Sequence, residues 1–228
     1  MNVFLDLYVA APVLTAHAPI LVVLAPLIGA CAVALSPGAR SGWVISVLTS
    51  LFALWMAVAV AGEVARNGVV QYVLGGFAPP LGIAFRIDAL GAGMGLLVSG
   101  IGFLGALYSG HVLASEVASQ KQTLFLAGYL LCATGYLGLV FTGDAFNAFV
   151  FLEVSSIGTY ALVATGEARD KRALPAAFNY LIWGTIGATF YVIGVGFLYA
   201  ATGTLNMADL AARLGTLGDS AAVQAGFA

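Results

Sequence analysis

Six long runs of apolar residues constrain this chain more than any other feature of its sequence. Each is close to or above the roughly 20 residues that an α-helix needs to cross the hydrocarbon core of a bilayer. The runs lie at residues 16–35, 42–62, 88–110, 122–142, 145–165 and 173–201. Because unpaired backbone groups are costly in lipid, each run is expected to be helical. The sequence therefore predicts an all-α integral membrane protein of about six transmembrane helices.

The composition agrees with this class and excludes several others. Hydrophobic residues make up 61% of the chain and charged residues 8%, with a mean hydropathy of +1.03. A soluble domain carries about 25% charged residues. The net charge of −2 and the lack of a dense basic cluster exclude a nucleic-acid binder. Cys31 and Cys132 lie inside apolar runs, and no Cys/His/Asp/Glu set has metal-ligand spacing, so we expect neither a metal nor another cofactor.

The segments outside the runs divide the chain. Residues 1–15 are expected to be an N-terminal lead-in, 16–211 the membrane domain and 212–228 a polar C-terminal tail. The start of the chain has no Lys or Arg before its apolar part, which argues against a cleaved signal peptide. The connector 63–87 contains short β-prone stretches with Gly-Gly and Pro-Pro pairs between them, which predicts an excursion that forms a β-hairpin.

The distribution of basic residues predicts an orientation. Six spans place the loops 36–41, 111–121 and 166–172 on one side of the membrane. These loops hold five basic residues, Arg40, Lys121, Arg169, Lys171 and Arg172, and the other side holds three, Arg66, Arg86 and Arg213. Since positive residues accumulate on the cytoplasmic side, loop 166–172 is expected in the cytoplasm. The connector 63–87 is then expected to face outward.

Glu153 is the candidate for chemistry. It lies about eight residues into the fifth run, about 12 Å from the start of that helix at 1.5 Å per residue, near the bilayer midplane. An ionisable group there costs at least about 2.5–3.5 kcal/mol, so it usually marks a partner or a pathway. A carboxylate whose proton affinity responds to a moving cation can carry protons. The alternative is a permanently protonated side chain bonded to a neighbouring helix.

Four further polar residues are candidates for a proton path with Glu153. Ser156 and Tyr160, at i+3 and i+7, share its helix face and could orient the carboxyl group or hold water. The alternative is ordinary helix–helix hydrogen bonding, worth about 0.6 kcal/mol on average. Asn179 in the sixth run fits a water wire, although a helix-packing amide is the favoured interpretation. His111 follows the third run and could relay protons or simply be solvated.

Three charged residues next to helix starts are expected to be structural. Asp144 precedes the fifth run and Asp88 the third, as N-cap residues that accept backbone N–H groups do. Arg86 lies two residues before Asp88 and could pair with it.

Several stretches then resemble a known family. T-G-D-A-F-N-A-F-V-F-L-E-V-S-S-I-G-T-Y-A-L (142–162) is similar to the antiporter-like subunits shared by Mrp-type cation/proton antiporters and respiratory complex I. F-R-I-D-A-L-G-A-G-M-G-L-L (85–97) and L-Y-A-A-T-G-T-L-N-M-A-D-L-A (198–211) strengthen the resemblance. The T-G-T-L-N-M-A-D-L stretch most resembles the D-type subunits of the Mrp antiporters.

The resemblance implies that Glu153 is the essential glutamate of that family, which works with a lysine on the seventh helix. This chain departs from the pattern, because its only lysines, Lys121 and Lys171, lie in loops. Asn179 also stands where relatives often have a basic residue. The chain is therefore expected to supply only the carboxylate half of a Glu–Lys switch. The remaining helices are expected on a partner polypeptide, unless the subunit is a scaffold or the sequence is incomplete.

The resemblance also implies a function and a location. The expected function is that of a transporter subunit, not itself an enzyme, in a multi-subunit Mrp-like cation/proton antiporter of the bacterial cytoplasmic (inner) membrane. Its expected partners are other membrane subunits, including a chain with intramembrane lysines, and lipids. One alternative is the membrane module of a complex I-like redox, hydrogenase or inorganic-carbon-uptake complex. Another is a structural subunit that does not pump. The transported cation stays open.

Overall fold

Long helices dominate the computed structural model, which describes residues 14–168, 170–217 and 220–228. Those in the described chain are α2 (Ala18–Ala34), α3 (Ala39–Asn67), α4 (Ala89–Glu116), α5 (Gln122–Phe141), α6 (Ala145–Ala164) and α7 (Ala173–Thr202). Helices α3 to α7 are long and apolar enough to cross a membrane, and α2 is a shorter apolar helix of 17 residues. The predicted all-α membrane architecture is confirmed. The predicted lead-in lies almost entirely outside the described residues.

Short elements join the helices at their ends. They are the strands β1 (Val70–Val73) and β2 (Ala84–Ile87), the 3₁₀ turns η1 (Leu74–Gly76), η2 (Ser119–Lys121) and η3 (Thr165–Ala168), and the helices α8 (Met207–Leu217) and α9 (Ala221–Phe227). β1 and β2 pair antiparallel, with Val70 opposite Ile87, so the hairpin predicted in the connector is present. The hairpin is shorter than that connector, because α3 continues to Asn67.

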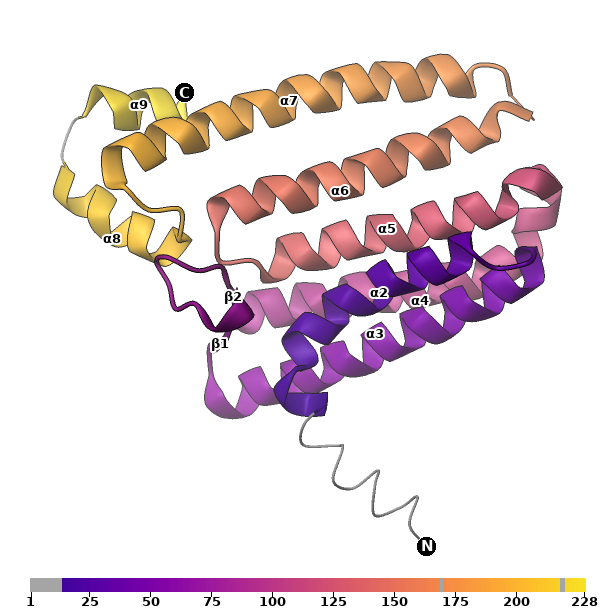
Figure 1. Cartoon of the computed structure of the whole chain (residues 1–228), viewed down its shortest axis with the longest axis horizontal. Helices are drawn as coiled ribbons and strands as arrows, with labels where there is room; N and C mark the ends of the chain where they lie inside the picture. Colours follow the sequence, from indigo (N-terminus) through magenta and orange to yellow (C-terminus); the bar gives the residue numbers. More distant parts are fainter. Residues whose placement is uncertain (1–13, 169, 218–219) are drawn as a thin grey trace, which may run out of the picture.

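The helices form a bundle with a two-helix extension. Helices α2, α3, α4 and α5 pack around two clusters of buried side chains, one with Met56, Leu137 and Phe141 and the other with Leu126. Helix α6 packs on α5, and α7 packs on the far side of α6, so that α7 lies at the edge of the molecule (Figure 1). Most side chains of α7 are exposed in consequence.

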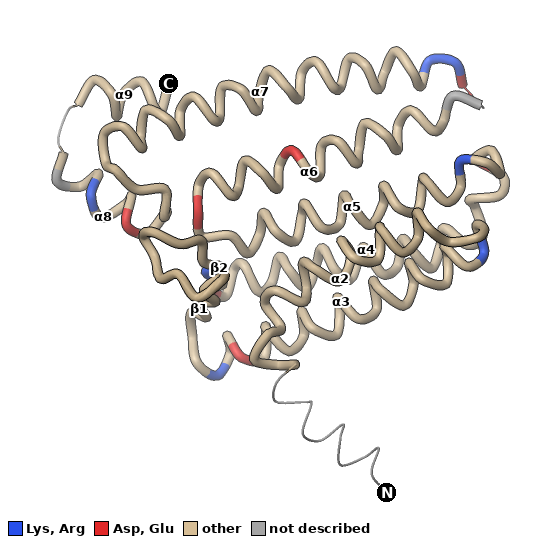
Figure 2. Tube along the Cα trace, viewed as in Figure 1, with Lys and Arg blue, Asp and Glu red and all other residues tan. Residues whose placement is uncertain are grey.

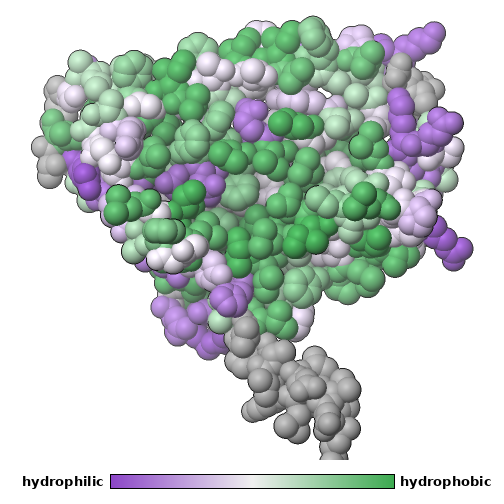
Figure 3. Space-filling model, viewed as in Figure 1, coloured by the Kyte–Doolittle hydropathy of each residue, from purple (hydrophilic) through white to green (hydrophobic). Residues whose placement is uncertain are grey.

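Charged residues gather at the two ends of the helices (Figure 2). The α2–α3, α4–α5 and α6–α7 loops lie together at one end, which we call the loop end. The β-hairpin and α8 lie at the other end, which we call the hairpin end. Apolar residues cover most of the face between the ends, and a small hydrophilic patch interrupts them over α6 (Figure 3).

Backbone hydrogen bonds tie three separate segments together at the hairpin end. The turn between α5 and α6 forms a bridge with the hairpin at Phe85 and Thr142, and a second bridge with the α7–α8 link at Asp144 and Asn206. The amide of Ala145 donates to the carbonyl of Leu205 at 2.9 Å. We call these bonded segments the hairpin-end layer. They fix the position of the first residue of α6 relative to the hairpin and to the α7–α8 link.

Candidate functional site

Glu153 lies in the middle of α6, eight residues after Ala145 and eleven before Ala164. It is the one acidic residue within α6, and Figure 2 shows acidic colour partway along that helix. Its side chain is half-buried, and among the described residues none forms a hydrogen bond or an ion pair with its carboxyl group. An ionisable group at this depth is costly when unpaired. The described part of the chain therefore provides no hydrogen-bonding or charged partner for the carboxyl group of Glu153.

The opposite face of α6 forms a tight seam with α5. Ser155 and Gly158 are buried in this seam. A Cβ atom on Gly135 of α5 would lie 2.5 Å from the backbone nitrogen of Ser155, so only glycine allows this approach. Residues 153 and 155 are about 200° apart around a helix of 3.6 residues per turn. The position of Glu153 is therefore turned away from α5.

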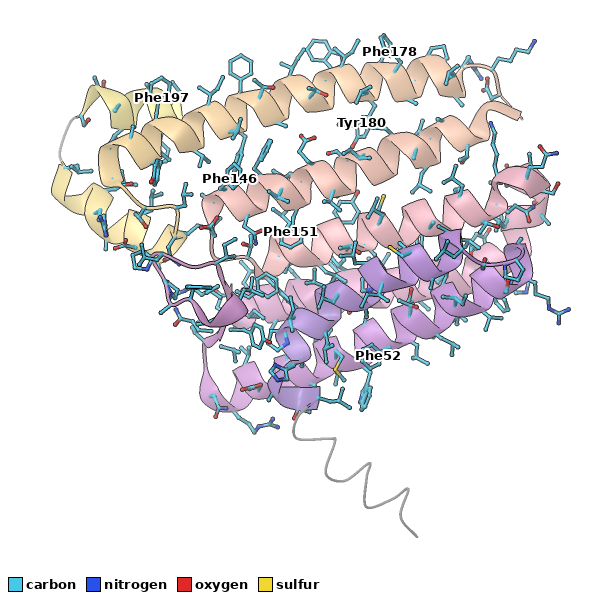
Figure 4. All side chains as sticks on the ribbon, viewed as in Figure 1. Phe52, Phe146, Phe151, Phe178, Tyr180 and Phe197 are labelled. Atoms are coloured by element: carbon cyan, nitrogen blue, oxygen red, sulfur yellow. The ribbon has the colours of Figure 1, made fainter. Side chains whose placement is uncertain are left out.

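Helix α7 covers the side of α6 that carries Tyr160. The rings of Tyr160 and Tyr180 meet edge to face, with centroids 5.2 Å apart, and Tyr180 lies between the two helices in Figure 4. Gly184 leaves room for the Tyr160 hydroxyl group. Near the hairpin end, the hydroxyl of Tyr191 donates to the carbonyl of Ala145 at 3.1 Å. Glu153 lies between these two contacts, on the same stripe of α6 as Tyr160.

A groove of about 740 Å³ opens between α6 and α7 on the loop-end side of Glu153. Its lining is mainly apolar and comes from both helices: Tyr160, Ala161, Ala164, Leu174, Pro175, Ala177, Phe178 and Leu181. Tyr160 is the α6 lining residue nearest to Glu153 in the sequence. Their separation of seven positions corresponds to about 10 Å along the helix axis. The groove thus leads from the loop end of the bundle toward the carboxyl group.

The other predicted path residues are divided between two parts of the molecule. Ser156 is half-buried on α6, one turn from Glu153, and Asn179 is exposed on α7, next to Tyr180. His111 is exposed on α4, which packs mainly on α3 and α5. Of the predicted path residues, the contacts across the α6–α7 seam include only Tyr160, since Asn179 is exposed and does not line the groove. His111 lies on a helix outside that seam.

The residues expected to be structural lie at the hairpin end. Asp88 is the N-cap residue of α4, where its Oδ1 accepts from the amide of Gly91 at 2.8 Å. Asp144 is the N-cap residue of α6, where its Oδ1 accepts from the amide of Asn147 at 2.7 Å. In the described residues no ion pair joins Arg86 to Asp88, and strand β2 carries Arg86 opposite Gln71.

The sequence did not predict the polar cluster of Thr159, Cys132 and Tyr136 between α5 and α6. The hydroxyl of Thr159 lies 3.4 Å from both the Cys132 sulfur and the Tyr136 hydroxyl, so these groups join α5 to α6 beside the tight seam. The spacing of Cys132 and Tyr136, four residues apart on one helix face, was the available signal. Within the described ranges, no three His, Cys, Asp or Glu side chains are placed to hold a metal ion.

Ion pairs order the segments at the two ends of α7. In the α6–α7 loop, Nη2 of Arg172 lies 2.8 Å from Oδ2 of Asp170, and this contact holds the pKa of the exposed Asp170 below its usual value. On α8, Arg213 pairs with Asp209 at 2.9 Å and lowers its pKa in the same way. Arg213 also donates to the carbonyl of Thr202, which closes the end of α7.

Comparisons with known proteins identify similar chains. A family model described as NADH dehydrogenase I, subunit N related protein, matches residues 96–225. NADH-quinone oxidoreductase subunit N of Desulforudis audaxviator is 44% identical over 214 residues, which are 92% of this chain and 42% of that protein. The D-type subunit of the Na⁺/H⁺ antiporter of Alkalihalophilus pseudofirmus is 32% identical over 174 residues, which are 76% of this chain and 34% of that protein.

A solved structure extends the likeness to three dimensions. The structure of the membrane-bound sulfane sulfur reductase, an archaeal respiratory membrane complex, contains a chain that matches with a TM-score of 0.82 and 31% identity. The match covers 92% of this chain and 42% of that chain. The present chain therefore spans less than half the length of these relatives.

Proposed function

Because the chain belongs to the family of NADH dehydrogenase I subunit N-related proteins, we propose that it is a subunit of a multi-subunit membrane complex in which Glu153 carries protons. The observation that carries this proposal is the placement of Glu153 halfway along α6 without a hydrogen-bonding or charged partner in the described chain. A group so costly to bury is usually present because it functions.

The proposed path runs along the α6–α7 seam. Protons enter the groove at the loop end, pass Tyr160 and Ser156 through water molecules held there, and reach Glu153. We propose that the loop end faces the cytoplasm and the hairpin faces outward, with the complex in a bacterial cytoplasmic membrane. The greater number of basic residues at the loop end supports this orientation.

A cation from outside this part of the molecule completes the proposed switch. Lys121 and Lys171 lie in η2 and in the α6–α7 loop, so neither reaches the middle of α6. We propose that a helix with an intramembrane lysine packs against the exposed face of α6 and α7. Its lysine would favour the ionised carboxylate when near and the protonated one when displaced. The exposed amide of Asn179 also needs a partner in an apolar medium.

Infrared difference spectroscopy of the purified full chain in lipid nanodiscs tests whether Glu153 titrates. We expect a protonated-carboxyl band that appears on acidification, is missing after Glu153→Gln and persists after Glu63→Gln. Glu63 is the matched control, because it lies near the end of α3. A band that stays at every pH, or a spectrum unchanged by Glu153→Gln, would overturn the proton-carrier role.

Two energy sources are candidates for the whole complex. Cation/proton exchange is supported by the T-G-T-L-N-M-A-D-L stretch and by the identity with the D-type subunit of a Na⁺/H⁺ antiporter. A redox-driven complex is supported by the higher identity with an NADH-quinone oxidoreductase subunit N and by the likeness to a chain of a respiratory sulfane sulfur reductase. In a redox-driven complex, other chains would carry out the redox chemistry.

The chains that co-purify with a tagged copy from its native membrane distinguish the two candidates. An antiporter predicts small membrane subunits together with a second chain that carries intramembrane lysines. A redox complex predicts soluble subunits with Fe–S clusters. Recovery of this chain alone after gentle extraction would contradict both candidates.

A further inference from the structure

A second groove lies at the loop end, between α3, α4 and α5. It has a volume of about 360 Å³ and is lined by Ala39, Arg40, Trp43, Gly110, Leu113, Ala114 and Gln122. None of these residues belongs to the α6–α7 seam. Small and aliphatic side chains form most of the wall, and Arg40 brings a positive charge to it. The proton-carrier proposal leaves this groove without a role.

Trp43 gives the groove a rigid wall. Its indole nitrogen donates to the carbonyl of Ala106 at 2.9 Å, which ties α3 to α4. The indole also lies directly over Gly110, where a Cβ atom would be 2.6 Å from the ring. Tryptophan is enriched at the level of lipid headgroups, where its ring meets the apolar core and its N–H finds a polar partner. The place of Trp43 near the loop end of α3, with its N–H bonded to a carbonyl, fits this tendency.

The charges around the groove favour an anion. Arg40 is exposed and has no hydrogen bond or ion pair within the described residues. The groove also includes the first turn of α3, which begins after Gly38 with no side-chain cap and no acidic residue. Gln122 adds no free donor, because its Nε2 already donates to the carbonyls of Leu113 and Val117.

We propose that this groove binds an anionic phospholipid. The guanidinium group of Arg40 and the first amide groups of α3 would hold the phosphate, and an acyl chain would lie along Leu113 and Ala114. Three features of the groove favour this occupant: an unpaired positive charge, an apolar wall in the same groove, and a tryptophan near the loop end of α3. Basic pockets between helices are typical lipid-headgroup sites.

Fluorescence quenching of Trp43 by brominated lipids tests the proposal. The full chain carries Trp55→Phe and Trp183→Phe, so that Trp43 is the sole tryptophan. It is reconstituted with brominated phosphatidylglycerol or brominated phosphatidylcholine in otherwise matched nanodiscs. Phosphatidylglycerol is expected to bind about fivefold more tightly, the factor that corresponds to roughly 1 kcal/mol for one basic residue at the surface.

Substitution at the two ends of the same helix provides the control. Arg40→Gln is expected to remove the preference for phosphatidylglycerol, whereas Arg66→Gln, at the hairpin end of α3, is expected to leave it unchanged. Equal quenching by the two lipids before any arginine is replaced would overturn the proposal. So would the absence of quenching by either lipid in the assembled complex, because a protein segment would then cover the groove.

Discussion

Glu153→Gln is expected to lower proton-coupled transport by the assembled complex about 100-fold, as the loss of a positioned proton-transfer group does. Glutamine has nearly the same size, and its side-chain amide can form hydrogen bonds, so the packing of α6 should survive. It cannot take up or release a proton. The folded protein should be at least as stable as before, because the cost of an unpaired ionisable group in the membrane disappears.

The measurement uses vesicles that contain the whole complex, with proton movement followed by a pH-sensitive dye. Glu153→Asp keeps a carboxyl group on a shorter side chain and should retain part of the activity. Glu63→Gln removes a glutamate near the end of α3 and should leave transport unchanged. Native gel electrophoresis checks that each complex is assembled. Normal transport by an intact Glu153→Gln complex would show that the glutamate is structural.

Gly135→Ala is expected to destabilise the chain by about 1–3 kcal/mol, the usual cost of overpacking a filled interior. The new methyl group would lie 2.5 Å from the backbone nitrogen of Ser155, and backbone cannot move aside as a flexible side chain can. Helix α6 must therefore shift away from α5. Because α6 carries Glu153, we expect transport to fall as well, even though Gly135 does not touch the seam with α7.

Unfolding of the purified chain by a denaturing detergent provides the measurement. Gly100→Ala on α4 is the control, because a Cβ atom there would meet nothing within 4 Å. That variant should unfold as the unchanged chain does. If Gly135→Ala unfolds at the same detergent concentration as Gly100→Ala, the α5–α6 seam is looser than the structure indicates.

Five of the six predicted spans, α3 to α7, are long and apolar enough to cross a membrane, because length and apolar composition decide where a chain can do so. The first predicted span, 16–35, is the shorter helix α2, which has 17 residues and Pro26 inside it. The ends of the predicted spans agree less well. Helix α3 continues to Asn67 and α4 to Glu116, past the predicted ends at 62 and 110. Both extensions contain charged residues. Hydropathy marks the part of a helix that lies in lipid, whereas hydrogen bonding continues beyond it.

The candidate site was predicted in part. The position of Glu153, with Ser156 and Tyr160 on one stripe, follows from helix periodicity alone. The groove beside Tyr160 depends on which helix packs against α6. The apolar pattern of one run does not determine which other helix will pack against it. For the same reason the placement of His111 on α4, outside the α6–α7 seam, could not be predicted.

The resemblance inferred from short motifs is confirmed by the family match over residues 96–225. The motifs at 85–97, 142–162 and 198–211 prove to be spatial neighbours at the hairpin end. Strand β2 and the start of α4, the α5–α6 turn and the α7–α8 link all meet there. The three stretches therefore share one set of backbone contacts in the fold.

The hairpin-end layer has a consequence for biogenesis. The amide of Ala145 finds its acceptor on Leu205, which the ribosome adds 60 residues later (205 − 145). That acceptor returns to the correct side of the membrane only if α6 and α7 have both been inserted, in opposite directions. The hydrogen bonds of the layer can therefore form only after α6 and α7 have been inserted in opposite directions. Until then the amide of Ala145 lacks the acceptor that it has in the folded chain.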